Sequence, residues 1–252
     1  MMGSTKLSLS RARLIRALHR GKGRRQEGAY LAEGLRLLDE LARSDASPRF
    51  LFATDRHAPW LLERFPGVDL FIIDDDAPSL FATENAQGAG AVIDMSDPPS
   101  LAESAGRPGP LIYLDALADP GNVGTILRTA EWFGFRTILF GQGSVDPYNP
   151  KVVRSSMGSI FRMELLEDIS HQDVLDLGRS VFALDAGGPH VLGQSILPSD
   201  AVYVVGGEAH GVSPVLRSHA DLLTIPGSGG VESLNAAIAA SILLYELSRA
   251  SR

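Results

Sequence analysis

Residues 202–211, with the sequence VYVVGGEAHG, contain the pattern that decides the fold of the C-terminal half of the chain. Residues 202–205 are β-branched and aromatic over the length of a strand, and the pair Gly206-Gly207 ends the run. A continuous apolar strand is typical of a parallel sheet that is buried on both faces. Glycines let a ligand approach the main chain closely, and Glu208 adds one carboxylate, but a glycine turn alone is weak evidence for a site.

Similar apolar runs recur on both sides of this stretch, with helical patterns between them. They are Leu111–Leu114, Thr137–Phe140, Val181–Leu184 and Leu222–Ile225. This alternation predicts an α/β fold with a largely parallel sheet covered on both faces. Open sheets of this class bind ligands at the carboxyl ends of their strands.

The N-terminal part indicates a second, smaller α/β domain. Leu31 to Arg43 has the pattern of an amphipathic helix, and strands are expected at Phe50–Thr54, Leu70–Ile73 and Ala89–Met95. Residues 96–110 lack periodicity and contain four prolines and two glycines. We therefore expect a domain at residues 1–97, a linker at 98–109 and a second domain at 110–252.

The charge is distributed unevenly along the chain. The formal net charge is −7, which by itself argues against nucleic acid, yet the first 25 residues contain no acid. Their eight basic residues are Lys6, Arg11, Arg13, Arg16, Arg20, Lys22, Arg24 and Arg25. Two interpretations stay open: a frayed basic tail, or a helix that contacts RNA.

Composition excludes several other classes of protein. Cysteine is absent, so there is no disulfide framework and no thiol nucleophile, and we expect a cytoplasmic protein. No apolar run is long enough for a membrane span, and none has the form of a signal peptide. The six histidines are scattered without ligand spacing, so we expect no metal site.

Two further segments follow predicted strands and carry polar residues. In residues 119–130, DPGNVGTILRTA, Pro120 and Gly121 predict a turn, Asn122 a helix N-cap, and Arg128 falls about one and a half turns into the helix. In residues 225–235, IPGSGGVESLN, a strand leads through a flexible loop into an apolar helix. Each taken singly also fits a capped helix with a surface arginine, or a loop before a core helix.

Taken together, in this order and spacing, the three segments resemble the signature motifs of the SpoU family of RNA ribose methyltransferases, within the SPOUT superfamily. The resemblance covers residues 109–252. It extends more weakly to Tyr30–Gly34 and Gln87–Val92, which are similar to the substrate-binding domain often fused ahead of it. One departure is Gly227 where the family commonly has Met, which removes a side chain from the cofactor loop but keeps its main chain.

The resemblance implies a deep trefoil knot that forms a pocket for S-adenosylmethionine, and an obligate homodimer. The residues that it assigns to the cofactor pocket are Gly206, Gly207, Ile225 and Leu234. Cofactor recognition is then expected to rest largely on main-chain groups.

The resemblance also assigns catalytic roles. Arg128 would bind the RNA phosphate and polarise the ribose 2′-oxygen, because a guanidinium keeps its protons and is a poor general base. Asn122 and Ser233 would orient the ribose or Arg128, Glu208 would hold the motif loops, and Asn235 would anchor the knot.

We expect RNA to be bound by a set of arginines: Arg11, Arg13, Arg16, Arg24, Arg25 and Arg154. The two-domain arrangement favours ribosomal RNA over tRNA. The alternatives are a tRNA 2′-O-methyltransferase and a non-catalytic RNA-binding protein on a knotted dimer scaffold. A nucleotide-binding enzyme using Gly206-Gly207 is a further alternative, although the chain lacks both G-x-G-x-x-G after its first strand and G-x-x-x-x-G-K-[ST].

Overall fold

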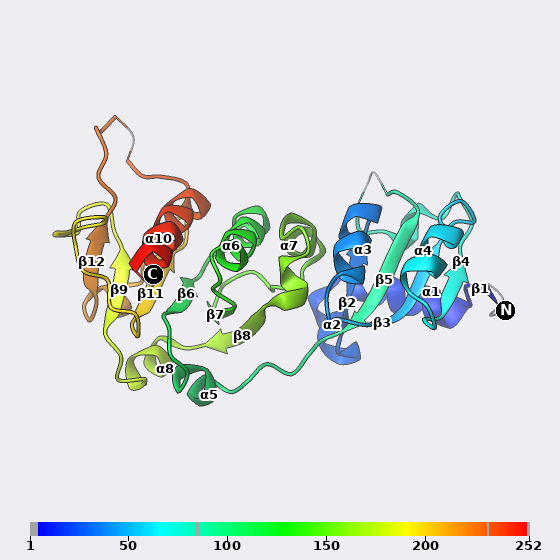
Figure 1. Ribbon diagram of the computed structural model, residues 1–252, viewed down its shortest axis with the longest axis horizontal. Coiled ribbons are helices and arrows are strands. Elements are labelled where there is room, and N and C mark those ends of the chain that lie inside the picture. Colours follow the sequence, from blue (N-terminus) through cyan, green and yellow to red (C-terminus); the bar gives the residue numbers. More distant parts are fainter. Residues whose placement is uncertain (1–4, 84–85, 231, 251–252) are drawn as a thin grey trace. The chain divides into compact units, whose positions relative to one another are not determined.

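The computed structural model describes residues 5–83, 86–230 and 232–250, and these form two compact units (Figure 1). The N-terminal unit comprises residues up to 97 together with residues 148–162, and the C-terminal unit comprises residues 98–147 and 163 onward. Val231, within the third motif segment, lies outside the described residues.

The segment 148–162 belongs by its contacts to the N-terminal unit, although the sequence placed it in the second domain. The ring of Tyr148 lies 4.8 Å from that of Tyr30. Arg162 Nη2 donates to Glu40 Oε2 at 3.0 Å. Apolar packing and a half-buried ion pair therefore hold this segment to the N-terminal unit.

The N-terminal unit contains a five-stranded sheet in the order β1-β4-β3-β5-β2, in which β5 runs antiparallel to β3 and β2. The strands are β1 (Thr5–Lys6), β2 (Ala29–Glu33), β3 (Pro48–Ala53), β4 (Leu70–Ile72) and β5 (Ala89–Asp94). The helices are α1 (Leu9–Leu18), α2 (Gly21–Glu27), α3 (Leu35–Ala42), α4 (Ala58–Arg64) and α7 (Pro150–Ser155), with 3₁₀ turns at Pro78–Leu80 and Ser159–Arg162.

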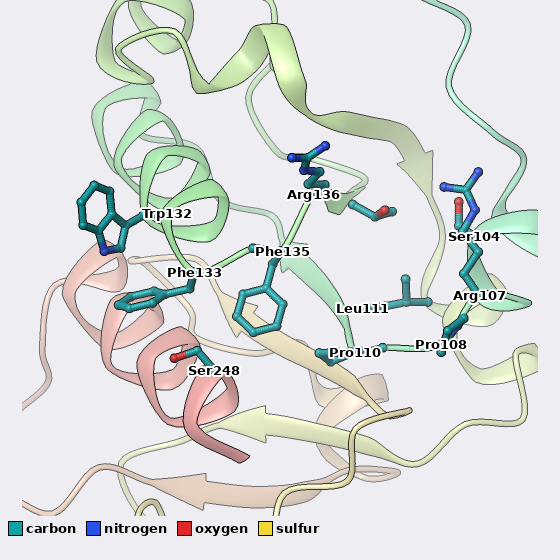
Figure 2. A pocket seen from close by; sticks show the side chains of 13 residues that line it. Ser104, Arg107, Pro108, Pro110, Leu111, Trp132, Phe133, Phe135, Arg136 and Ser248 are labelled. Carbon is teal, nitrogen blue, oxygen red and sulfur yellow. The ribbon is translucent and has the colours of Figure 1, made fainter. Parts of the chain in front are cut away.

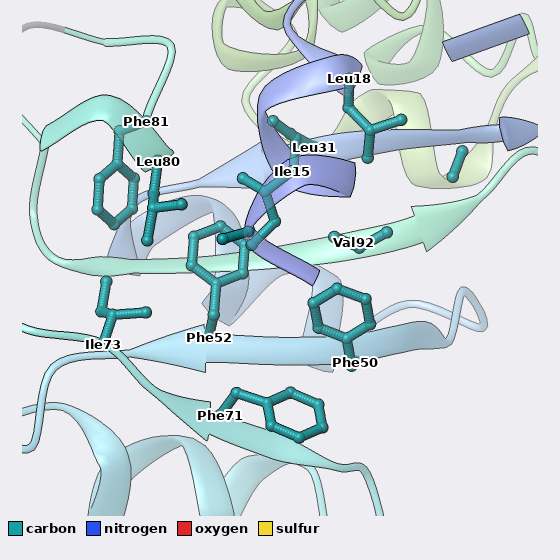
Figure 3. Packing of buried hydrophobic residues seen from close by; sticks show 12 residues of the cluster. Ile15, Leu18, Leu31, Phe50, Phe52, Phe71, Ile73, Leu80, Phe81 and Val92 are labelled. Carbon is teal, nitrogen blue, oxygen red and sulfur yellow. The ribbon is translucent and has the colours of Figure 1, made fainter. Parts of the chain in front are cut away.

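Helix α1 packs on one face of this sheet through an apolar stripe (Figure 3). Ile15 and Leu18 are fully buried there against Phe50 and Phe52. Gly90 lies beneath Phe52, and a Cβ at this position would be 2.4 Å from the ring, so only glycine fits. The basic N-terminal stretch is therefore an ordered, packed helix from Leu9 and not a frayed tail.

The single helix expected over Leu31–Arg43 is wrong at its start. Residues Ala29–Glu33 form β2, which pairs antiparallel with β5. Gly34, with a φ of 97°, separates that strand from α3. The apolar residues of a buried strand and of an amphipathic helix follow each other here without a polar break, so periodicity alone merged the two elements.

The C-terminal unit is a seven-stranded, entirely parallel sheet in the order β10-β12-β9-β11-β6-β7-β8, which confirms the predicted fold class. The five expected strands are β6 (Leu111–Asp115), β7 (Thr137–Gly141), β9 (Val181–Leu184), β11 (Val202–Gly206) and β12 (Asp221–Thr224). Two strands at the sheet edges were not predicted, the acid-containing β8 (Glu164–Ile169) and the two-residue β10 (His190–Val191).

Helices cover both faces of this sheet (Figure 1). They are α5 (Leu101–Ala105), α6 (Pro120–Trp132), α8 (His171–Asp176), α9 (Pro214–Arg217) and α10 (Ala236–Ala250). On one face Leu111 and Tyr113 pack with residues of α5, α8 and α9. On the other face α10 packs against α6, where Ser241 Oγ donates to Thr129 Oγ1 at 3.3 Å. The threading that would close a trefoil knot stays a prediction.

The segment 98–109 is part of the C-terminal unit, and the expectation of an interdomain linker there is wrong. It contains α5, which begins with a capping box between Ser100 and Glu103. Arg179 donates to the carbonyl oxygens of Arg107 and Gly109, both at 2.8 Å. The prolines lie outside this short helix, so they limit its length without preventing it.

Glu33, at the end of β2, generates a prediction about pH. Its Oε1 accepts a hydrogen bond from Ala82 N at 2.7 Å, and burial is the main cause that raises its pKa above 4.5. A raised pKa means that the wild type loses stability as pH rises from the unfolded pKa through the folded one. We expect Glu33→Gln, which cannot ionise but keeps the acceptor, to raise the melting temperature more at about pH 8 than at about pH 5.

Thermal unfolding at the two pH values measures this difference. Glu63→Gln on the exposed side of α4 is the control, and we expect it to shift the melting temperature equally at both. An equal shift for Glu33→Gln would contradict the prediction.

Candidate active site

The three motif segments begin at one edge of the parallel sheet. Strands β6, β11 and β12 run in the same direction, so their carboxyl ends share an edge. Residues 116–122, 206–211 and 225–230 leave the sheet from these ends. Ligands of open parallel sheets bind at this edge, and the topology therefore places the motif segments where a site is expected.

Helix α6 begins one turn before the position that the sequence indicated. Asp119 is the N-cap, and its Oδ1 accepts a hydrogen bond from Asn122 N at 2.8 Å, so the prediction of Asn122 as N-cap is wrong. Pro120 occupies the first helical position, where the missing N–H costs nothing. This arrangement leaves the side-chain amide of Asn122 available for contacts with other segments.

The amide of Asn122 joins the other two motif segments. Its Nδ2 donates to Glu208 Oε1, and its Oδ1 accepts from Asn235 Nδ2 at 3.0 Å. The Oδ1 of Asn235 also accepts from Ala237 N and Ile238 N, at 3.0 and 3.2 Å, and so caps α10. Three residues that are 86 and 113 positions apart thus form one hydrogen-bonded junction.

Glu208 lies on a turn that only glycines can form. A Cβ on Gly206 would lie 2.2 Å from the Gly211 carbonyl carbon, and one on Gly207 would lie 2.5 Å from the Ala116 oxygen. Gly211 has a φ of +65° and closes the turn by donating its N–H to Gly207 O at 2.9 Å. The two glycines that the sequence assigned to a cofactor pocket are thus required by the main chain itself.

The remaining predicted residues lie around the junction without contacts to it. Arg128 and Ser233 are exposed and form no hydrogen bond or ion pair within the described part of the chain. Ile225 is half-buried, and Leu234 is 45% exposed. Residues 226–230 are exposed, and no hydrogen bond to their main chain is found among the described residues. The structure therefore brings together Asn122, Glu208 and Asn235 and leaves Arg128 unpartnered.

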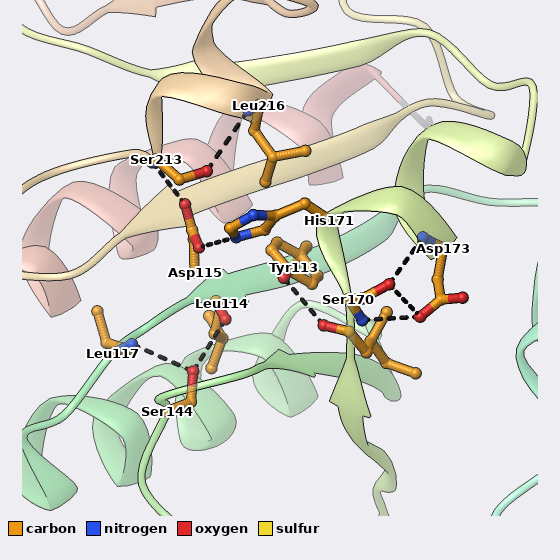
Figure 4. A network of polar contacts seen from close by, with 11 residues as sticks. Tyr113, Leu114, Asp115, Leu117, Ser144, Ser170, His171, Asp173, Ser213 and Leu216 are labelled. Atoms are coloured by element: carbon orange, nitrogen blue, oxygen red, sulfur yellow. Dashed lines mark hydrogen bonds and ion pairs between the residues drawn. The ribbon is translucent and has the colours of Figure 1, made fainter.

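A buried carboxylate below this edge was missed by the sequence analysis (Figure 4). Asp115, the last residue of β6, is 2% exposed. Its Oδ1 lies 2.8 Å from His171 Nε2, and its Oδ2 accepts from Ser213 N at 2.7 Å. The only signal in the sequence is one acid directly after an apolar run, which by itself indicates no more than a strand end.

The arginines predicted to bind RNA are not equally placed. Arg24 is 2% exposed and donates Nη1 to Leu18 O at 2.8 Å, so its assignment to RNA does not fit the structure. Arg11 is half-buried, with its guanidinium 4.0 Å from the centre of the Phe71 ring. The others, Arg13, Arg16, Arg25 and Arg154, are exposed.

A cavity of 560 Å³ lies at the opposite edge of the sheet, beside the first residues of β6 and β7 (Figure 2). Trp132, Phe135 and Arg136 are among its lining residues. None of the predicted catalytic or cofactor residues lines it, because those residues follow the carboxyl ends of the strands.

Within residues 5–83, 86–230 and 232–250, no three histidine or acidic side chains are grouped so that they could hold a metal ion. In the same part of the chain, no helix has the length and apolar character needed to cross a membrane.

A parallel α/β unit whose three carboxyl-edge segments meet at Asn122 has the organisation of an RNA methylase, and comparison with known families agrees. The SpoU rRNA Methylase family matches residues 109–245, and the chain belongs to this family. An MRM3-like substrate binding domain matches residues 10–90. The resemblance drawn from the motifs is thereby confirmed.

Among its relatives is the 23S rRNA (guanosine(2553)-2′-O)-methyltransferase RlmP of Bacillus subtilis, which is 34% identical over 91% of this chain and 92% of its own length. An AdoMet-bound rRNA methyltransferase from Sinorhizobium meliloti superposes with a TM-score of 0.82 at 25% identity, covering 97% of this chain and 96% of the other. The SpoU methyltransferase AviRb from Streptomyces viridochromogenes, in complex with AdoMet, gives 0.81 at 25% identity, covering 95% and 98%.

Asn235 has two separable roles, as cap of α10 and as donor to Asn122. We expect Asn235→Ala to lose about 1 kcal/mol of stability with the cap, or about 2 to 4 °C in melting temperature, and to weaken binding of S-adenosylmethionine. Asn235→Asp keeps the capping oxygen but has no N–H for Asn122, so it should weaken that binding with a smaller loss of stability. Calorimetric titration and thermal unfolding of both variants test this. Wild-type affinity in Asn235→Asp would show that the junction does not shape the cofactor site.

Proposed function

We propose that this chain transfers the methyl group of S-adenosylmethionine to a ribose 2′-hydroxyl of ribosomal RNA. The observation that carries the proposal is the Asn122–Glu208–Asn235 junction, which unites the three motif segments of a SpoU family member at the ligand-binding edge of its sheet. The names of the relatives support it, because they include a 23S rRNA 2′-O-methyltransferase and AdoMet-bound rRNA methyltransferases.

The residues at this edge fit S-adenosylmethionine. Among the described residues no hydrogen bond reaches the main chain of residues 226–230, so these groups are available to the cofactor, and a Cβ on Gly227 would meet no atom within 4 Å. The absence of a larger side chain at this position therefore leaves the loop's hydrogen-bonding groups in place. Gly206 and Gly207 bring a second main-chain segment to the same edge, with Ile225 and Leu234 supplying apolar surface. When bound, the cofactor supplies an electrophilic methyl group on a sulfonium.

Arg128 has the properties required to bind and activate the RNA. Its guanidinium is exposed and unpartnered within the described residues, so binding a phosphate breaks no existing ion pair. A fixed positive charge beside the 2′-oxygen stabilises the negative charge that develops during transfer. Because a guanidinium keeps its protons, another group or water accepts the hydroxyl proton. Asn122, held between Glu208 and Asn235, and the nearby Ser233 are available to orient the ribose.

A homodimer is part of the proposal. Helices α6 and α10 pack together and expose three large apolar side chains: Trp132 at 83%, Ile238 at 54% and Tyr245 at 49%. Apolar surface shared by two neighbouring helices marks an interaction site more than scattered residues do. A second copy of the chain is the partner we propose, with Arg128 on α6 close in sequence to that surface.

Ribosomal RNA is preferred to tRNA because residues 10–90 match an MRM3-like substrate binding domain, and because two relatives, RlmP of Bacillus subtilis and the human mitochondrial rRNA methyltransferase 3, are named for rRNA. A non-catalytic RNA-binding protein, the main alternative, would bind the same RNA without turnover. The cytoplasm remains the expected compartment.

Arg128→Ala should abolish methyl transfer and leave binding of S-adenosylmethionine within about threefold of wild type, because Arg128 forms no hydrogen bond or ion pair with the described residues of the cofactor loops. Transfer of tritium from the labelled cofactor to total ribosomal RNA, and titration calorimetry without RNA, measure the two effects. Arg136→Ala, an exposed arginine beside the amino end of β7, is the matched control and should retain activity. Substantial turnover by Arg128→Ala would refute its role.

The exposed arginines of the N-terminal helices test how RNA is bound. Removal of residues 1–25 would delete buried Ile15 and Leu18 and unfold the unit, so substitutions are needed. If Arg13, Arg16 and Arg25 each contact a phosphate, replacing all three by Gln should lower the slope of log K against log salt by about 2 to 3. Arg36→Gln on α3 is the control, and filter binding at several salt concentrations is the measurement. Equal slopes of log K against log salt for the triple variant and the wild type would show that the RNA is bound by another surface.

A further inference from the structure

We infer that Asp115 is a positioning residue that sets the place of the turn carrying Glu208, and through it the affinity for S-adenosylmethionine. The inference rests on the proposed function, in which this turn lines the cofactor pocket. Asp115 contacts the turn from the buried side of the sheet, so it acts through the turn and is not a catalytic residue.

The first arm of the turn, residues 206–207, is positioned by the main chain around Asp115. Gly206 pairs with Asp115 in the parallel register of β11 and β6. The next residue, Gly207, packs so closely on Ala116 that a Cβ would be 2.5 Å from the Ala116 oxygen. Ala116 itself has a φ of 52°, a left-handed conformation that is uncommon for a residue with a side chain. Any shift of residues 115–116 is therefore transmitted to the start of the turn.

The second arm of the turn, residues 211–213, is positioned by the side chain of Asp115. Ser213 donates its N–H to Asp115 Oδ2 at 2.7 Å, two residues after Gly211 closes the turn on Gly207. One residue thus holds both arms, the first through its backbone and the second through its carboxylate. Glu208 lies between these two anchors, and its own carboxylate receives the amide of Asn122.

The carboxylate has little freedom to release either partner. Asp115 is 2% exposed, so water cannot replace a lost hydrogen bond, and a buried carboxylate without partners is costly. Its other oxygen lies 2.8 Å from Nε2 of His171, the first residue of α8. With both oxygens engaged from different elements, the carboxylate has one orientation, and the position of Ser213 follows from it.

The backbone N–H of Ser213 can be removed by substitution with proline, whose ring then occupies the space beside the Asp115 carboxylate. Ser213 has a φ of −56°, which proline adopts, so Ser213→Pro deletes the donor to Asp115. It also deletes the Oγ that accepts from Leu216 N at 3.4 Å, and Ser213→Ala is the control for that loss because it keeps the N–H. The comparison of Pro with Ala tests the loss of the hydrogen bond to Asp115 together with the displacement of its carboxylate by the proline ring.

Asp115→Asn approaches the same contact from the other side. With Nε2 of His171 as donor, the tautomer that pairs with an ionised carboxylate, the amide keeps the shape of the side chain but presents only one acceptor oxygen for two donors. Its control is Asp173→Asn in α8, whose carboxylate accepts from Ser170 N and Oγ at 2.8 and 2.6 Å and caps that helix away from the turn. The control should lower the melting temperature by about 2 to 4 °C without changing cofactor affinity.

The experiment is titration calorimetry of the full-length chain with S-adenosylmethionine in the absence of RNA, with folding checked by circular dichroism. We expect Ser213→Pro and Asp115→Asn to raise the Kd at least about ten-fold relative to Ser213→Ala and Asp173→Asn. At saturating cofactor, kcat of the two variants should change less than the Kd, because Arg128 lies on α6 and the turn reaches Asn122 only through Glu208.

Affinity within about threefold of the controls for both folded variants would overturn the inference, and so would loss of folding in both, which would make Asp115 a determinant of stability only. Failure of the proposed function has a different signature. A wild type that binds S-adenosylmethionine but methylates no ribosomal RNA would refute the RNA assignment and leave the result for Asp115 intact.

Discussion

The side-chain amide of Asn122 is the interaction on which the site depends. A primary amide is both donor and acceptor, so Asn122 can receive Asn235 on its oxygen while giving its NH₂ to Glu208. Aspartate at this position would lack the donor and would face the Glu208 carboxylate as a like charge. Leucine would have the volume without either group. One residue type therefore satisfies both partners, and its position in the first turn of α6 follows from the Asp119 cap and Pro120.

The parallel sheet makes this junction possible. Its strands end at a common edge, so segments more than a hundred residues apart in the sequence leave the sheet side by side. The side chain of Asn235 connects two elements, because its Oδ1 caps α10 and its Nδ2 donates to Asn122. The start of a 15-residue helix is thereby tied to the motif on α6, and the two helices continue into shared packing at Ser241 and Thr129.

Apolar runs predicted every central strand of the C-terminal sheet, because a strand buried on both faces leaves an unbroken hydrophobic signal. The same signal failed at Leu31, where strand and helix adjoin, and at β8, where acids interrupt an edge strand. Three residues that the motifs assigned to the site, Asn122, Glu208 and Asn235, meet there, whereas Arg128 and Ser233 form no contact with them among the described residues. Charge density alone could not predict that Arg24 is buried, because it does not tell which side of a helix faces the core. No sequence motif marked Asp115 as a buried, hydrogen-bonded carboxylate, and its partners Ser213 and His171 are distant in sequence.

The contacts of residues 148–162 with the N-terminal unit have a consequence for how the two units can be separated. The chain passes from one unit to the other near residues 97, 147 and 162, so three covalent connections join them. The two units are therefore not independent modules joined by a single linker. Exchanging residues 1–97 for the corresponding part of a relative would leave Tyr148 and Arg162 facing a foreign surface in place of Tyr30 and Glu40. Chimeras within the family would have to carry both pieces together, and residues 1–97 and 148–162 are therefore expected to change in concert during evolution.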